Sequence, residues 1–285
     1  MSTMRSGLFP ARPAGRPLTI DEHDRAQLDR DVRSAVAQGQ FDIHWQPIVN
    51  CRTGALYGFE ALLRWDRPGH GRVSPAIFVP IAEALGLHQQ LDTWVLFRAC
   101  HEAARWPAPY HLAVNVSAAW FDGTSLSTTV RNALLATKLD PSRLELEVTE
   151  RIFFDAAGGS AKAELAYLKA LGVNLSLDDF GTGFSSLGYL RTIAFDKIKL
   201  DRSFIQTLGS CRRTEVIVRS LLQLSTGLGM QVCAEGVEVE DQLGILQAYR
   251  CDEVQGYLIG HPGHITSETI QTYSRLGENG MFSAG

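Results

Sequence analysis

The sequence predicts an α/β protein, specifically a modified TIM (β/α)8 barrel whose first strand is antiparallel. Eight strand-like runs alternate with helical patterns through short connections, which is typical of a parallel sheet. The chain has 285 residues, and a single barrel of this kind usually needs about 250. The first two strands are separated only by residues 50–55, a turn that can join antiparallel strands but not parallel ones.

The predicted elements follow one another in a regular order. Residues 21–40 predict an amphipathic helix, because Leu28, Val32 and Ala35 recur at helical spacing before Gly39. Residues 74–87 begin with Ser-Pro and end near Gly86, as helices do, and a second helical pattern follows at 89–106. Further helices are predicted over residues 125–139, 160–172, 213–229, 239–249 and 266–277. The strands are predicted over residues 41–49, 56–65, 110–117, 144–150, 173–180, 196–201, 230–237 and 253–259.

Composition and charge exclude several classes of protein. Hydrophobic residues make up 45% of the chain and charged residues 20%, which fits a globular protein. The formal net charge is −4 and the sequence has no dense Lys/Arg run, so we expect no binding to double-stranded nucleic acid. No apolar run approaches the roughly 18 residues that a membrane span requires.

The cysteines and histidines give no sign of a disulfide framework or a zinc site. The five cysteines are odd in number, widely spaced and free of any C-x-x-C pair, which is typical of reduced thiols and predicts a cytoplasmic protein. The eight histidines show no ligand motif. His261 and His264 form an isolated H-x-x-H in a turn rich in Pro and Gly, and we expect no metal there.

Two terminal segments fall outside the predicted domain, which spans residues 21–277. Residues 1–20 contain Arg and Pro but no apolar core of a signal peptide, so they predict a flexible lead or the remnant of a linker. Residues 278–285 predict a flexible tail.

Polar and apolar residues alternate along the predicted strands. In the run 144–150, Leu144, Leu146 and Val148 share one parity, and Glu145 and Glu147 share the other. Half-exposed antiparallel strands show the same alternation, so one strand alone does not decide between the two structures. However, the polar residues fall late in their strands, and catalytic groups gather at the carboxyl ends of barrel strands. The pattern therefore predicts that seven strands bring together Glu60, Asn115, Glu147, Asp178, Lys199, Glu235 and Gln255.

Such a cluster of carboxylates predicts a metal site. Like charges packed closely raise one another's pKa and oppose folding unless a cation is present. Carboxylates with an Asn carbonyl are hard oxygen ligands, which suit Mg²⁺ or Mn²⁺ rather than Zn²⁺. More than four carboxylates suggest two ions sharing a bridging Asp, an arrangement that promotes hydrolysis of phosphate esters. Lys199 adds a positive charge that could face the attacked phosphate or orient water, although many magnesium-dependent barrels share these ingredients.

The run "LSLDDFGTGFSSL" (residues 175–187) places two carboxylates side by side. Neighbours on a strand point to opposite faces, but Asp178 and Asp179 stand where the strand ends, so Asp179 can turn inward as the chain bends toward Gly181. The G-x-G fragment lacks the third glycine of a dinucleotide site. We interpret it as a movable loop, with Ser185 and Ser186 opening a short helix.

Eight motifs occur in order on the predicted strand ends: "QPIV", "EALLRW", "NVS", "EVTE", "DDFGTGFSSL", "KIKLD", "AEGVE" and "QGYLIGHP". In them the chain closely resembles the EAL-domain phosphodiesterases of bacterial cyclic di-GMP signalling, over about residues 25–275. The resemblance implies a TIM-like barrel with an antiparallel first strand. It also implies hydrolysis of cyclic di-GMP to linear pGpG by two Mg²⁺ or Mn²⁺ ions, with inhibition by Ca²⁺. It further implies a homodimer, and a sensor or regulatory domain if the chain is part of a longer protein.

The resemblance assigns roles to individual residues. It implies that Asp178 bridges the two metals and that Lys199 positions the attacking water, while Glu235 acts as general base or supports the metal site. Glu150 resembles the residue that anchors the loop after Asp179, and that loop contributes to the dimer. The implied catalytic residues are Glu60, Lys199 and Glu235; the implied metal ligands are Glu60, Asn115, Glu147, Asp178, Asp179 and Glu235; the implied substrate-binding residues are Arg64, Leu62, Gln255, Glu238 and Gln46.

The sequence departs from the family pattern at two positions, and neither is one of the implied catalytic, metal-binding or substrate-binding residues. Phe184 stands where Tyr is common and His261 where Lys is frequent, so no catalytic position is altered. Two alternatives stay open at this level: a module of the same fold that binds cyclic di-GMP or a protein without hydrolysis, and an unrelated magnesium barrel acting on a phosphorylated metabolite.

Overall fold

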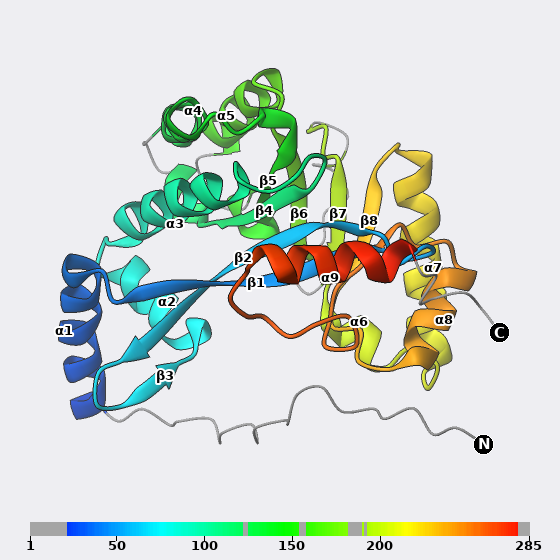
Figure 1. Ribbon diagram of the computed structural model, residues 1–285, viewed down its shortest axis with the longest axis horizontal. Coiled ribbons are helices and arrows are strands. Elements are labelled where there is room, and N and C mark those ends of the chain that lie inside the picture. Colours follow the sequence, from blue (N-terminus) through cyan, green and yellow to red (C-terminus); the bar gives the residue numbers. More distant parts are fainter. Residues whose placement is uncertain (1–21, 122–124, 154–157, 182–189, 191–192, 279–285) are drawn as a thin grey trace.

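The computed structural model describes residues 22–121, 125–153, 158–181, 190 and 193–278 (Figure 1). The predictions for the lead over residues 1–20 and for the loop residues Phe184, Ser185 and Ser186 lie outside the described residues, as does the predicted tail over 278–285 except for Glu278, which ends a helix.

The described strands form a closed mixed barrel. In the sheet, β1 pairs with both β2 and β9, and this double pairing closes the ring of eight strands. β3 (Gly71–Val73) only extends β2 at the barrel's outer edge. The barrel strands are β1 (Phe41–Asn50), β2 (Leu56–Arg67), β4 (His111–Val116), β5 (Leu144–Thr149), β6 (Asn174–Phe180), β7 (Lys197–Leu200), β8 (Gln231–Ala234) and β9 (Glu253–Val254).

The antiparallel first strand is confirmed. β1 runs antiparallel to both of its neighbours, whereas the pairings from β2 through β4 to β9 are parallel. The turn between β1 and β2 is stabilised by Asn50, whose Oδ1 accepts hydrogen bonds from the backbone N–H of Arg52 and Thr53 and from the Thr53 hydroxyl. Because the connection is only a short turn, the second strand must run back antiparallel to the first.

Helices surround the barrel and cover its outer face (Figure 1). α9 crosses alongside β2, where Tyr273 packs edge-on against Phe59 with 6.0 Å between ring centroids. The helices are α1 (Glu22–Gln38), α2 (Pro75–Ala84), α3 (His88–Ala103), α4 (Leu126–Thr137), α5 (Gly158–Ala170), α6 (Arg202–Gln206), α7 (Arg212–Gly227), α8 (Glu240–Ala248) and α9 (Ser267–Glu278). Among the described residues, no helix has the length and apolar character needed to cross a membrane.

The strand alternation separates two buried environments. On β5, Leu144, Leu146 and Val148 are fully buried in the apolar core between the strands and the helices. Glu145 and Glu147 point the other way, yet each is only 1% exposed, because they fill the barrel's interior. A half-exposed antiparallel strand would leave such glutamates in water, so that alternative is excluded.

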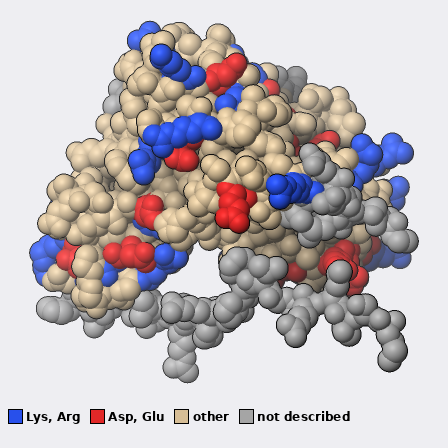
Figure 2. All heavy atoms as spheres, in the orientation of Figure 1, with Lys and Arg blue, Asp and Glu red and all other residues tan. Residues whose placement is uncertain are grey.

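Several elements differ from the sequence-based prediction: β3 was not predicted, and β8 ends at Ala234 rather than at residue 237. The strand predicted over residues 253–259 ends at Val254. The Gln255 N–H still donates to Ala234 at the end of β8, but the Gln255 carbonyl and the Leu258 N–H bond to Val237, which lies beyond that strand. The short helix α6 was not predicted; Asp201 starts it by accepting a hydrogen bond from Ser203 N–H (2.9 Å). On the face drawn in Figure 2, acidic and basic side chains are interspersed.

Candidate active site at the carboxyl ends of the strands

A pocket opens at the carboxyl ends of the parallel strands. Its volume is about 240 Å³. Because β1 runs in the opposite direction, it contributes Gln46 from its middle, directly opposite Glu60 on β2. The lining residues are Gln46, Glu60, Leu62, Asp178, Arg202, Glu235, Gly236, Glu238, Gln255, Gly256 and Tyr257.

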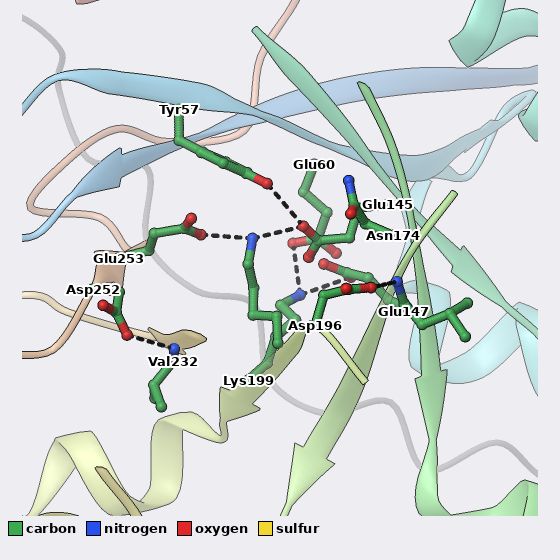
Figure 3. Close-up of polar contacts among 12 residues, drawn as sticks. Tyr57, Glu60, Glu145, Glu147, Asn174, Asp196, Lys199, Val232, Asp252 and Glu253 are labelled. Atoms are coloured by element: carbon green, nitrogen blue, oxygen red, sulfur yellow. Dashed lines mark hydrogen bonds and ion pairs between the residues drawn. The ribbon is translucent and has the colours of Figure 1, made fainter. Parts of the chain in front are cut away.

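Lys199 lies at the centre of the carboxylates. Its Nζ is 2.6 Å from Glu235 Oε1 and 2.7 Å from Glu147 Oε2, and Figure 3 shows Lys199 reaching toward Glu147 inside the barrel. The same Nζ is 3.4 Å from Glu60 Oε2 and 3.8 Å from Asp178 Oδ1. Lys199 is 1% exposed, so these ion pairs are shielded from water.

Two amide side chains hold Glu60 in place. Asn115 Nδ2 donates to Glu60 Oε1 (2.7 Å), and Gln255 Nε2 donates to Glu60 Oε2 (2.6 Å). Gln255 also donates to Gln46 Oε1 (3.0 Å), and Gln46 in turn donates to the carbonyl of Gly260 (3.3 Å). Despite its burial, Glu60 keeps a lowered pKa, because Lys199 and these amides outweigh the cost of desolvation. Glu60 is therefore held in one position in the pocket and stays ionised.

The other carboxylates are held close together at an electrostatic cost. Burial is the main reason that the pKa of Glu147 lies well above its ordinary value, and burial raises the pKa of Glu235 to about 8. Burial alone would lower the pKa of Lys199, but the surrounding carboxylates raise it well above its usual range. One ammonium thus faces four carboxyl groups. Glu147 Oε1 is buried and has no hydrogen-bond partner among the described residues.

Asp178 and Asp179 reach the same edge because the strand bends between them. Asp179 has a φ of 54°, a left-handed conformation that few residues other than glycine adopt. The Asp179 N–H donates to Asp178 Oδ1 (2.9 Å), which stabilises the bend. Asp178 is nearly buried while Asp179 is exposed, and burial together with Asp178 raises the pKa of Asp179 to about 6. The backbone departs from a regular strand at Asp179, as predicted, but Asp179 is exposed and does not line the pocket, so its inward turn stays a prediction.

The model of the EAL domain matches residues 29–262 of this sequence. The chain belongs to the EAL domain family. A Caulobacter vibrioides protein described as an uncharacterized signaling protein is 41% identical over 280 residues, covering 95% of this chain and 34% of that protein. The bifunctional diguanylate cyclase/cyclic di-GMP phosphodiesterase MucR of Pseudomonas aeruginosa is 41% identical over 249 residues, covering 86% of this chain and 36% of its own length.

A solved structure has the same fold as this EAL domain. The PaMucR phosphodiesterase in complex with c-di-GMP superposes with a TM-score of 0.80 at 41% identity, covering 86% of this chain and 99% of that chain. This agreement confirms the predicted TIM-like barrel. The EAL domain described here spans about a third of the length of the curated relatives it matches.

Not every residue implied for substrate binding lines the pocket of this EAL domain. Leu62, Gln46, Gln255 and Glu238 do. Arg64 is half-buried, does not line it, and donates from Nη1 to the carbonyl of Leu63 (2.9 Å).

Arg202 and Tyr257 line the pocket although no role was assigned to them from the sequence. Both stand inside or directly after recognised motifs, "KIKLD" and "QGYLIGHP", and that position was the only available signal. The other implied residue, Glu150, is buried at the end of β5, and most of the loop that it is predicted to anchor lies outside the described residues.

A second buried ionic network lies deeper in the barrel. Lys197 Nζ is 2.6 Å from Glu145 Oε2 and 2.7 Å from Glu253 Oε2, and Tyr57 donates to Glu145 (3.3 Å; Figure 3). The ammonium also lies 4.1 Å from the centre of the Tyr57 ring. Sequence reasoning missed this network, although Glu145 and Lys197 share the strand parity of Glu147 and Lys199.

Proposed function

We propose that this EAL domain hydrolyses cyclic di-GMP to linear pGpG with Mg²⁺ or Mn²⁺. The observation that carries the proposal is the cluster in which Glu60, Glu147, Asp178 and Glu235 surround Lys199. Glu60, Asp178 and Glu235 of this cluster also line the pocket. The relative MucR is named a bifunctional diguanylate cyclase/cyclic di-GMP phosphodiesterase, and the PaMucR phosphodiesterase structure is a c-di-GMP complex, which supports the choice of substrate.

The residues at the rim fit hard divalent cations. They are oxygen donors with excess negative charge, and the unpartnered Glu147 Oε1 is a buried acceptor that a cation would satisfy. Asn115 turns its Nδ2 toward Glu60, so its Oδ1 is the atom left for a metal. When bound, the ions supply Lewis acidity that polarises the phosphate and lowers the pKa of water. We propose Glu60, Asn115, Glu147 and Asp178 for one ion, and Asp178 and Asp179 for the other, with Glu235 beside them.

The chain's own side chains position the reacting groups. Lys199 remains protonated, so it can hold a water molecule by donating to its oxygen and can face the negative charge that builds up on the phosphate. Glu235 lies 2.6 Å from this ammonium. In its ionised form, which bound cations would favour, it can accept a proton from the same water or support the metal site. Arg202 places a cation in the pocket wall, which suits a substrate with two phosphates. Arg64 remains a proposed phosphate ligand; its side chain would have to turn toward the pocket.

A product assay tests the proposal. Purified protein is incubated with cyclic di-GMP and Mg²⁺ or Mn²⁺, and the products are separated by chromatography. We expect pGpG with either ion and little with Ca²⁺, a larger and less acidifying cation. Glu60→Gln should retain binding of cyclic di-GMP but lose turnover. If folded protein binds cyclic di-GMP without releasing pGpG under any metal, the chain is a receptor rather than an enzyme.

The homodimer, a regulatory domain elsewhere in a longer protein and the cytoplasmic location remain predictions. The role of Glu150 is also proposed: Glu150→Ala should weaken Mg²⁺ binding and turnover while the barrel stays folded. Unchanged metal dependence in this variant would separate Glu150 from the loop after Asp179.

A further inference from the structure

A second group of ligand atoms lies where β1 begins, beside the segment that follows β9. Asp42 and His44 are two residues apart on β1, so their side chains point to the same side of the strand. His264 joins them from the C-terminal segment, and one ligand atom from each residue lies within 4.8 Å of the other two. In the part of the chain that the structure describes, no other three His, Cys, Asp or Glu residues converge this closely.

The distances suit a small metal ion. Asp42 Oδ2 is 3.6 Å from His264 Nδ1 and 4.0 Å from His44 Nε2. Ligands bound tetrahedrally at about 2.1 Å from a zinc ion lie about 3.4 Å apart. To share one ion, the Asp42 carboxylate would have to approach the two imidazoles from 3.6 and 4.0 Å to about 3.4 Å, and the two imidazole nitrogens, which lie within 4.8 Å of each other, would have to reach the same separation.

The backbone and the ring of His44 are already oriented for binding. His44 Nδ1 faces the carbonyl of Pro262 at 3.4 Å, which fixes the ring and leaves Nε2 directed at Asp42. Metal-binding histidines typically donate their second ring nitrogen to a carbonyl or carboxylate in this way. Two backbone hydrogen bonds between Trp45 and Gly263, of 2.8 and 3.1 Å, hold the strand and the C-terminal segment together.

The local charges permit a cation at this position. Arg72 is the strongest nearby positive charge acting on His44, but Asp66 binds it through two hydrogen bonds of 3.0 Å and offsets it. Arg64 is the other arginine facing His44. The Asp42 carboxylate, whose Oδ2 lies within 4.0 Å of a nitrogen of each imidazole, supplies negative charge for a bound cation.

We infer that Asp42, His44 and His264 form a binding site for a transition-metal dication such as Zn²⁺, separate from the carboxylate site for Mg²⁺ or Mn²⁺. Two imidazoles with one carboxylate select Zn²⁺, Ni²⁺ or Cu²⁺ over the hard cations. His44 lies opposite Leu62 and two residues before Gln46, so the site stands on the rim of the pocket. A metal there would fasten the segment that follows Tyr257 to β1.

Zinc titration tests this inference. The full chain is stripped of metal with a chelator, dialysed into excess Mg²⁺ so that the rim carboxylates are saturated, and titrated with Zn²⁺ by calorimetry. We expect one Zn²⁺ per chain, an affinity at least about tenfold lower in His264→Ala, and a similar loss in Asp42→Asn. His264 is 73% exposed, so its replacement should not disturb folding.

Two control variants separate this site from its neighbours. His261→Ala removes an exposed histidine three residues away that stacks on Tyr257 (4.2 Å), and it should bind Zn²⁺ as the unmodified chain does. Glu60→Gln weakens the carboxylate site and should leave Zn²⁺ binding unchanged. Equal Zn²⁺ affinity in the unmodified chain and His264→Ala would overturn the inference, as would loss of binding in Glu60→Gln.

Discussion

At the scale of single residues, the Lys199 ammonium offsets the electrostatic repulsion among the surrounding carboxylates. It forms ion pairs with carboxyl groups from four different strands or strand ends. Removing one partner of a buried ionic group leaves the others uncompensated, which costs more than the pair itself contributes. The ammonium and the proposed metal ions therefore share the task of neutralising the same carboxylates.

Replacing Lys199 by Met should separate metal binding from turnover. Without the ammonium the carboxylates should bind Mg²⁺ more tightly, whereas turnover of cyclic di-GMP should fall by about 10²–10³-fold. Calorimetry and product release measure the two effects. Lys169→Met, which removes a lysine paired with Asp196 outside the pocket (2.5 Å), serves as the control and should change neither. Parallel loss of both properties in Lys199→Met would point to a folding defect instead.

Asp92 predicts a pH dependence of stability that is independent of the metals. Burial raises its pKa from about 3.8 to about 6, although its Oδ2 accepts hydrogen bonds from Trp120 Nε1 (2.7 Å) and Ser117 N–H (3.3 Å). A raised pKa means that the folded protein holds the proton more tightly than the unfolded chain does. The free energy of unfolding should therefore fall as the pH rises from about 4 to about 6.

Asp92→Asn isolates this effect, since Asn keeps the acceptor oxygen and cannot ionise. Near pH 4 the variant and the unmodified chain should be similarly stable, and near pH 7 the variant should be more stable by about 1–3 kcal/mol. Urea unfolding at a series of pH values measures the difference. A difference that does not change between pH 4 and pH 7 would contradict the shifted pKa.

At the scale of elements, the barrel depends on close approach between neighbouring strands. A methyl group built on Gly58 in β2 would lie 2.0 Å from the carbonyl oxygen of His111 in β4. The two strands pair at this position, so the clash cannot be relieved by moving a flexible side chain. A shift of β2 at Gly58 would also displace Glu60, because Glu60 follows two residues later on the same strand.

Gly58→Ala should therefore destabilise the domain by about 3 kcal/mol or more. Gly244 supplies the matched control: it lies exposed in α8, and nothing stands within 4 Å of an added methyl group. Gly244→Ala should stabilise the domain by up to about 1 kcal/mol, because Ala favours the helix. Thermal unfolding of the two variants gives the comparison, and similar effects from both would argue against the close approach of β2 and β4.

At the scale of the whole molecule, the barrel interior contains two ionic layers. The deeper one joins Glu145, Lys197 and Glu253, and the upper one surrounds Lys199. None of the three residues of the deeper layer lines the pocket at the carboxyl ends of the strands, and we assign this layer to stability. Burial raises the pKa of Glu253 to about 7, and the Lys197 ammonium opposes that rise.

Lys197→Met should consequently lower the free energy of unfolding by about 3–5 kcal/mol, because it leaves two buried carboxylates unpaired. Molecules that remain folded should keep their turnover of cyclic di-GMP and their response to Mg²⁺. Denaturant unfolding and the product assay, normalised to folded protein, test the two statements. A turnover loss comparable to that of Lys199→Met would mean that the two layers act as one site.

The sequence alone determined the order of strands and helices, the antiparallel first strand and the polar residues at the strand ends, because these depend on local periodicity and turn chemistry. Tertiary structure alone decided which groups meet. The register of the closed barrel places Glu147 and Glu235 on Lys199, sets Glu145 and Glu253 on Lys197, and brings His264 to Asp42 and His44. Such contacts join residues far apart in the chain, and their distances follow from strand register and closure rather than from spacing.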